Sequence, residues 1–81
     1  MDAFEKRVEI TQRIARYESG SEVPINIGYV AVVNSREEPI WERTVLDVFK
    51  LFPFPRPHFD KRLEKAASKA QSIADNLNAS Q

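Results

Sequence analysis

Cysteine is absent from this chain of 81 residues, and histidine occurs once, as His58. Without thiols the chain can form neither a disulfide scaffold nor a thiolate metal site, and it has no thiol nucleophile. A zinc site at His58 would need several carboxylates from separate parts of the chain. As a general base, His58 has no orienting carboxylate at a fixed spacing, although Asp60 is two residues away. We therefore predict no metal site and no catalytic residue here.

Glycine is scarce as well, since only Gly20 and Gly28 occur. They are eight residues apart and lack the lysine and the hydroxyl residue of a phosphate-binding loop. None of the serines stands in a motif that would expose it as a nucleophile. The sequence therefore predicts a protein that is not an enzyme and that binds no cofactor.

An excess of charge of either sign is also missing, because twelve Lys and Arg residues offset twelve Asp and Glu residues. This balance argues against a dedicated nucleic-acid-binding protein or a basic membrane-surface peptide. The longest apolar run, residues 29–33, is far too short to span a bilayer. Residues 1–7 mix acids with bases and lead into no apolar segment of a secretory signal. We expect a cytoplasmic protein with no membrane contact.

A content of 42% apolar residues is typical of a folded chain, and the length allows one small domain over residues 1–81. A helix is predicted over residues 1–20. Asp2 and Glu5 have the spacing of a capping box, and Gly20 suits the left-handed end of a helix. The apolar face of this predicted helix comprises Phe4, Val8, Ile10, Thr11, Ile14, Ala15 and Tyr17.

Residues 23–52 are predicted to hold a strand and then a short helix or a second strand. β-Branched residues without a helical period favour a strand over residues 25–33. One face of that strand would carry Ile25, Ile27, Tyr29, Ala31 and Val33, and the other Asn26, Gly28, Val30 and Val32.

The segment after residue 39 has two interpretations. Apolar residues at helical spacing, and a capping box formed by Ser35 and Glu38, favour a helix. Residues 44–49 are also β-prone and would pair back onto the first strand as a hairpin. The helically spaced residues are Trp41, Val45, Val48, Phe49 and Phe52. We favour the helix and leave the strand open.

The C-terminal third begins with a proline-rich elbow over residues 53–57, where alternate prolines exclude a helix. Residues 58–78 are rich in strong helix formers and predict a long helix. Six of its apolar residues alternate at spacings of four and three, as in a heptad repeat. These residues are Phe59, Leu63, Ala66, Ala70, Ile73 and Leu77. We predict that this seam mediates either self-association or packing within the chain.

The predicted fold is therefore a small α+β domain with an N-terminal helix, a short strand or hairpin, a short helix and a long C-terminal helix. Too few strands for a substantial sheet, and many large apolar residues, lead us to expect a homodimer. The predicted contacts with a partner protein are Trp41, Phe52, Phe54 and Arg56. The predicted function is that of a non-catalytic protein–protein interaction or regulatory adaptor domain.

Nucleic-acid binding is the alternative function, and it would use the basic face of the C-terminal helix. Arg62, Lys65 and Lys69 follow the i, i+3, i+7 spacing that places side chains on one helix face. An ordinary solvated face explains the same spacing and is the preferred interpretation.

Overall fold

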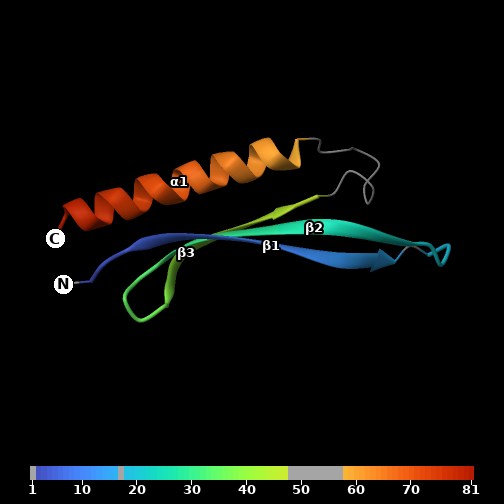
Figure 1. The fold of residues 1–81 in the computed structure, drawn as a ribbon, viewed down its shortest axis with the longest axis horizontal. Helices are drawn as coiled ribbons and strands as arrows, with labels where there is room; N and C mark the ends of the chain where they lie inside the picture. Colours follow the sequence, from blue (N-terminus) through green and yellow to red (C-terminus); the bar gives the residue numbers. More distant parts are fainter. Residues whose placement is uncertain (1, 17, 48–57) are drawn as a thin grey trace.

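The computed structural model describes residues 2–16, 18–47 and 58–81. Three antiparallel strands and one C-terminal helix form two layers (Figure 1). The strands are β1 (Glu5–Arg16), β2 (Glu22–Val33) and β3 (Pro39–Leu46), and the helix is α1 (Phe59–Ala79). Strand β2 is central, so β1 and β3 form the two edges of the sheet. The predicted α+β class is confirmed, but the predicted order of elements is wrong.

The predicted N-terminal helix is wrong because residues 5–16 form strand β1. This strand pairs with β2 along its whole length, from Glu5 opposite Val33 to Arg16 opposite Glu22. Its apolar residues also satisfy a period of two, which is the period of a strand. The residues concerned are Val8, Ile10 and Ile14. Pairing with a β-branched neighbouring strand therefore prevails over the local helical pattern.

The capping signals in the sequence belong to turns and loop contacts. The Asp2 carboxylate accepts a hydrogen bond of 2.7 Å from the Ser35 hydroxyl and caps no helix. Gly20 has a φ of 89° in the turn between β1 and β2. The Asn34 side chain accepts from the backbone N–H of Glu38 at 3.0 Å, in the turn between β2 and β3. Residues suited to a helix end are thus equally suited to a tight chain reversal.

The favoured helix after residue 39 is also wrong, and the hairpin alternative is confirmed. Strand β3 pairs antiparallel with β2, with Leu46 opposite Ile27 at one end and Pro39 opposite Val33 at the other. The register shifts between Val32 and Val33. The proline-rich elbow predicted over residues 53–57 lies outside the described residues.

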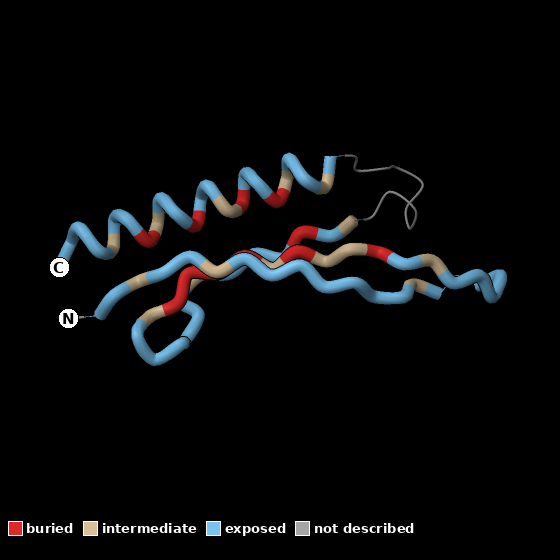
Figure 2. Tube along the Cα trace, viewed as in Figure 1, coloured by how far each residue is buried: buried red, intermediate tan, exposed pale blue. Residues whose placement is uncertain are grey.

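Helix α1 confirms the predicted C-terminal helix and covers one face of the sheet. Figure 2 shows its buried residues on the side toward the strands. Three of them are small, namely Ala66, Ala70 and Ala74. On β2, a Cβ atom added at Gly28 would lie 2.5 Å from Cδ1 of Leu63. The absence of a side chain at Gly28 is therefore what allows the helix to approach this closely.

The two faces of β2 carry the residues predicted for them. Gly28, Val30 and Val32 lie on the face toward α1, where the two valines belong to the main hydrophobic core. That core comprises Val30, Val32, Val45, Leu63, Ala66, Ala70 and Ala74. Ile25, Tyr29 and Ala31 alternate with them and lie on the other face, which we call the open face.

Candidate functional site

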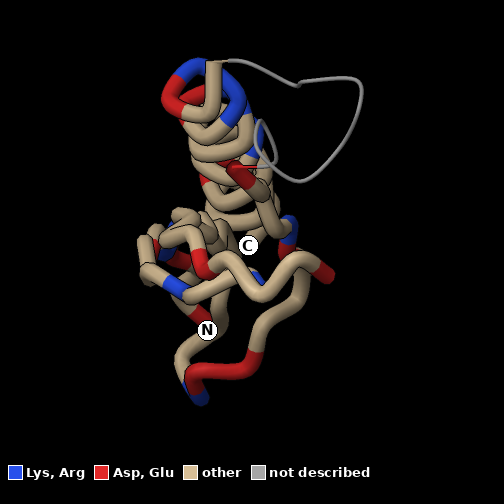
Figure 3. Tube along the Cα trace, turned by 90° about the vertical axis from the view of Figure 1, so that its right-hand side faces the viewer, with Lys and Arg blue, Asp and Glu red and all other residues tan. Residues whose placement is uncertain are grey.

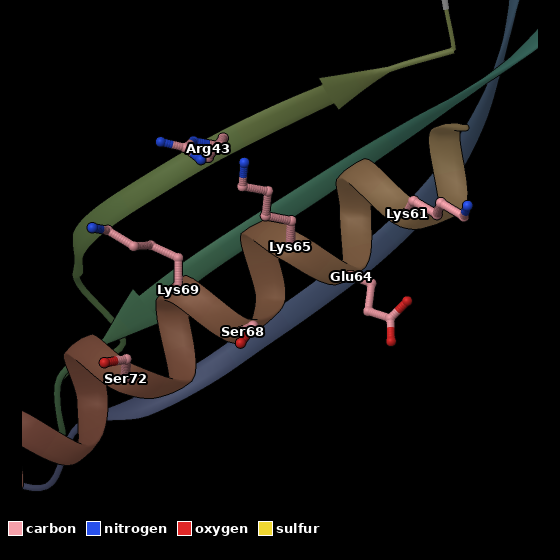
Figure 4. Close-up of a pocket in the computed structure, with 7 residues that line it drawn as sticks. All are labelled: Arg43, Lys61, Glu64, Lys65, Ser68, Lys69 and Ser72. Atoms are coloured by element: carbon pink, nitrogen blue, oxygen red, sulfur yellow. The ribbon is translucent and has the colours of Figure 1, made fainter. Parts of the chain in front are cut away.

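An open groove of about 790 Å³ runs along the exposed side of α1 and reaches β3 at Arg43 (Figure 4). Its lining contains four cationic side chains, one acid and two hydroxyls. The lining residues are Arg43, Lys61, Glu64, Lys65, Ser68, Lys69 and Ser72. Positive charge and hydroxyl donors together suit an anionic ligand.

The periodicity of α1 separates its charges. Lys61, Lys65 and Lys69 are spaced four residues apart and share one flank of the helix. Asp60 and Glu64 also stand four apart and share the other flank. The view along the helix in Figure 3 shows acidic and basic residues on different sides of it. A chain without net charge therefore still presents a mainly positive surface along this groove.

Strand β3 contributes the fourth cation of the groove. Arg43 pairs in register with Val30, so its side chain is on the face of the sheet toward α1. Its guanidinium carbon lies 5.5 Å from the centre of the Trp41 ring, within the range of a cation–π interaction. In Figure 4 the side chains of Arg43, Lys65 and Lys69 gather on the same side of the helix. The ring of Trp41 thus positions Arg43 beside the lysines.

Two of the three residues of the predicted basic face lie in this groove, namely Lys65 and Lys69. The third, Arg62, donates from Nη2 to the backbone carbonyl of Leu46 at 2.9 Å. Lys61 takes its place, and the i, i+4, i+8 spacing could have identified it. Arg43 could not have been found in the same way, because its proximity to the helix depends on the pairing of β3 with β2.

The edge strand β1 forms a second exposed surface. Val8, Ile10 and Ile14 have exposed fractions of 41%, 57% and 61%. They lie on the face toward α1, since Val8 pairs with Val30 and Ile10 with Gly28. The helix buries the matching side chain of β3, Val45, to 5% exposure. Coverage by α1 is therefore uneven and leaves the apolar row of β1 in contact with solvent.

The predicted self-association residues pack against the chain's own sheet. Leu63, Ala66 and Ala70 are buried in the core, and Ala74, which the heptad assignment omitted, is buried with them. Phe59, Ile73 and Leu77 are partly buried and pack against the same core. The intramolecular alternative thus describes the packing of this seam. The structure contains one chain and does not show dimerisation.

Of the predicted partner contacts, only Trp41 is among the described residues. It is half-buried and packs against the core. Phe52, Phe54 and Arg56 lie outside the described part of the chain.

The open face carries ionic contacts near the edges of the sheet. Arg7 forms ion pairs with Glu37 and, at 3.7 Å, with Glu5. The hydrogen bond from Arg7 lowers the pKa of the Glu37 carboxyl below its ordinary value of 4.5. The hydroxyl of Tyr29 donates to Glu42, which raises the pKa of Tyr29 above 10.0, with burial adding to the effect.

Within residues 2–16, 18–47 and 58–81, no three metal-ligating side chains gather at one point. No helix in the same residues is long and apolar enough to cross a membrane. Comparison of the sequence and structure with protein-family models, curated proteins and solved structures gives no match.

Proposed function

We propose that this chain is a non-catalytic protein-association module whose partner is a second copy of itself, bound through β1. The observation that supports this is the pattern of β1, a strand of twelve residues at the edge of the sheet. An edge strand offers unpaired backbone N–H and C=O groups to another strand. In β1 the charged side chains, which often protect such an edge, are arranged so that the strand complements itself.

The complementary register is antiparallel and centred on Thr11. Glu9 then lies opposite Arg13 of the second copy, and Arg13 opposite Glu9, so that two ion pairs form on the open face. On the face toward α1, Val8 lies opposite Ile14 of the second copy, again twice. Cross-strand pairs of these kinds contribute about 0.2–1 kcal/mol each. In this register, the exposed charges and the exposed apolar residues of β1 both find complementary partners on the second copy.

The neighbouring registers complement themselves less well. A centre on Ile10 places Arg7 opposite Arg13 of the second copy, so that like charges face each other twice. A centre on Glu9 pairs Glu5 with Arg13 and Val8 with Ile10, but it places the two Glu9 carboxylates opposite each other in the middle of the interface. A centre on Thr11 places Lys6 opposite Arg16 of the second copy near the ends of the strand, where Arg16 is already paired with Glu22 at 2.8 Å. Thr11 is therefore the centre that keeps like charges away from the middle of the interface and combines opposite charges with the apolar pairs of Val8 and Ile14.

Charge reversal tests the association. In static light scattering, the wild-type chain should have about twice its mass of 9.3 kDa at high micromolar concentration. Glu9→Arg places an arginine opposite Arg13 of the other copy at two symmetry-related positions, so the variant should be a monomer. The double variant Glu9→Arg/Arg13→Glu should restore the dimer. Glu18→Arg makes the same change in the exposed turn before β2 and should leave the dimer intact.

The register can be tested separately, because the chain has no cysteine of its own. Thr11→Cys brings two thiols together at the symmetry centre, so oxidation should give a covalent dimer. Thr44→Cys, on the far edge strand, should stay monomeric on a denaturing gel. A wild-type monomer at every concentration would refute the proposal, and crosslinking of both variants alike would refute the register.

A further inference from the structure

We propose that the groove along α1, together with Arg43 of β3, binds the phosphate backbone of a nucleic acid. Four of its seven described lining residues are cationic, and one is acidic. The proposal concerns a different edge of the sheet from the association through β1, so either one can fail without the other.

The cations of the groove lack acidic partners in the described structure. The ion pairs among the described residues involve Arg7 and Arg16, and neither is near the groove. Glu64 is the one acid of the described lining, and in Figure 4 its side chain points away from Arg43, Lys65 and Lys69. Like charges held together without a counter-charge repel one another. A bound polyanion would relieve that repulsion and release its own counterions.

The shape of the charged row favours a polymer over a single phosphate. Lys61, Lys65 and Lys69 are spread over two intervals of four residues, which is about 12 Å along a helix axis. Ser68 and Ser72 line the same groove, and serine hydroxyls commonly donate to phosphate oxygens. Charges and donors distributed along a line match an anion that repeats along a chain.

The chemistry of the groove favours contact with the backbone rather than with bases. None of its described lining residues is aromatic, so they provide no platform on which bases stack. The nearby ring of Trp41 already holds Arg43 over it. Binding should therefore depend little on sequence and strongly on salt. An acidic peptide has the same sign of charge, so the test must separate the two.

Fluorescence anisotropy with a labelled mixed-sequence DNA duplex tests the inference on the full chain. Four phosphate contacts predict a slope of about −3.6 for log K against log salt, which is a loss of about 150-fold in affinity between 50 and 200 mM salt. The variant Lys65→Gln/Lys69→Gln should reduce the slope to about −1.8. Both changes are at exposed helix positions, so circular dichroism should show an unchanged fold.

The matched control removes two cations elsewhere. Arg16→Gln/Arg36→Gln lowers the net charge by the same amount on β1 and on the turn after β2, and it should leave the slope unchanged. An equal loss in the control would show that only net charge matters and would overturn the proposal. Absence of binding at low salt would overturn it as well. Equally tight binding of labelled polyglutamate would replace the nucleic acid with an acidic peptide.

Discussion

The C-terminal end of β2, residues 30–33, is buried on both faces, but the two faces are covered in different ways. Toward α1, Val30 and Val32 are fully buried beneath a helix whose contact residues include Ala66 and Ala70. On the open face no helix or strand of the described chain lies over the sheet, yet Ala31 is also fully buried. Burial alone therefore does not tell how sensitive a position is to substitution.

The neighbours of Ala31 on the open face carry long side chains. Arg7 on β1 and Glu42 on β3 are its register partners. Arg7 is held by its ion pair with Glu37, and Glu42 accepts a hydrogen bond from Tyr29. Long charged side chains can cover apolar surface with their stems while their polar ends stay in water. On the helix side, burial of β2 thus depends on closely fitting side chains. On the open side it depends on long charged side chains that can move and titrate.

The loss in the free energy of unfolding should differ most between the two faces when a carboxylate is introduced on each. Ala70→Glu forces bulk and charge into the contact between α1 and the sheet, where Ala70 has no exposed surface. Overpacking and desolvation should cost at least about 3 kcal/mol in the free energy of unfolding. Ala31→Glu should cost about 1 kcal/mol or less, because the new side chain can extend to solvent between its neighbours. Urea denaturation measures both values.

Lys69→Glu is the control for charge on the same helix, since Lys69 is exposed and adjacent to Ala70. It should cost less than about 0.5 kcal/mol. Equal losses for Ala70→Glu and Lys69→Glu would show that the helix face is not closely packed. Equal losses for Ala70→Glu and Ala31→Glu would remove the distinction between the two faces.

A smaller effect is expected where the helix touches the backbone of β2. Gly28→Val adds a branched side chain whose Cβ would lie 2.5 Å from Leu63 and 3.3 Å from Phe59. Overpacking of this kind should cost about 2 kcal/mol. Leu63→Ala alone should also destabilise, because it opens a cavity. The double variant should lose less than the sum of the two, since the space vacated at Leu63 receives the valine. Simple additivity in thermal or urea denaturation would contradict this packing.

The sequence allowed the C-terminal helix and the two faces of β2 to be predicted, because both have a clear period over many residues. The N-terminal segment had two periods at once. Val8, Ile10 and Ile14 fit a strand, and together with Phe4 and Tyr17 they also fit a broad helical face. The choice between them depends on pairing with β2, a contact between distant residues that a local pattern does not contain.

The candidate groove was predictable in part for the same reason. Lys65 and Lys69 belong to one helix, so their spacing alone places them together. Arg43 joins them only because β3 pairs with β2 and α1 lies over the same face. The heptad seam was identified, but its partner was the sheet rather than another helix. Periodicity shows which face of an element is buried, and the rest of the fold determines what covers it.

The smallest expected effect concerns pH, to which only the open face should respond in a specific way. Arg7 lowers the pKa of Glu37, so the folded state binds a proton there less readily than the unfolded state, whose ordinary value is 4.5. The stability from this pair is thus present above pH 4.5 and is lost as the pH falls through the folded-state pKa.

Glu37→Gln removes this titration while keeping the size of the side chain. The difference in melting temperature between wild type and Glu37→Gln should be constant from neutral pH down to about 5 and should shrink below 4.5. Gly28→Val is the comparison on the helix side. The difference in melting temperature between wild type and Gly28→Val should not follow this pH dependence, because Leu63 and Phe59, which the new side chain contacts, carry no titratable group. A Glu37→Gln deficit that stays constant down to pH 3 would show that the Arg7–Glu37 pair contributes no charge-dependent stability. Only the apolar stems of the long side chains would then contribute to stability on the open face.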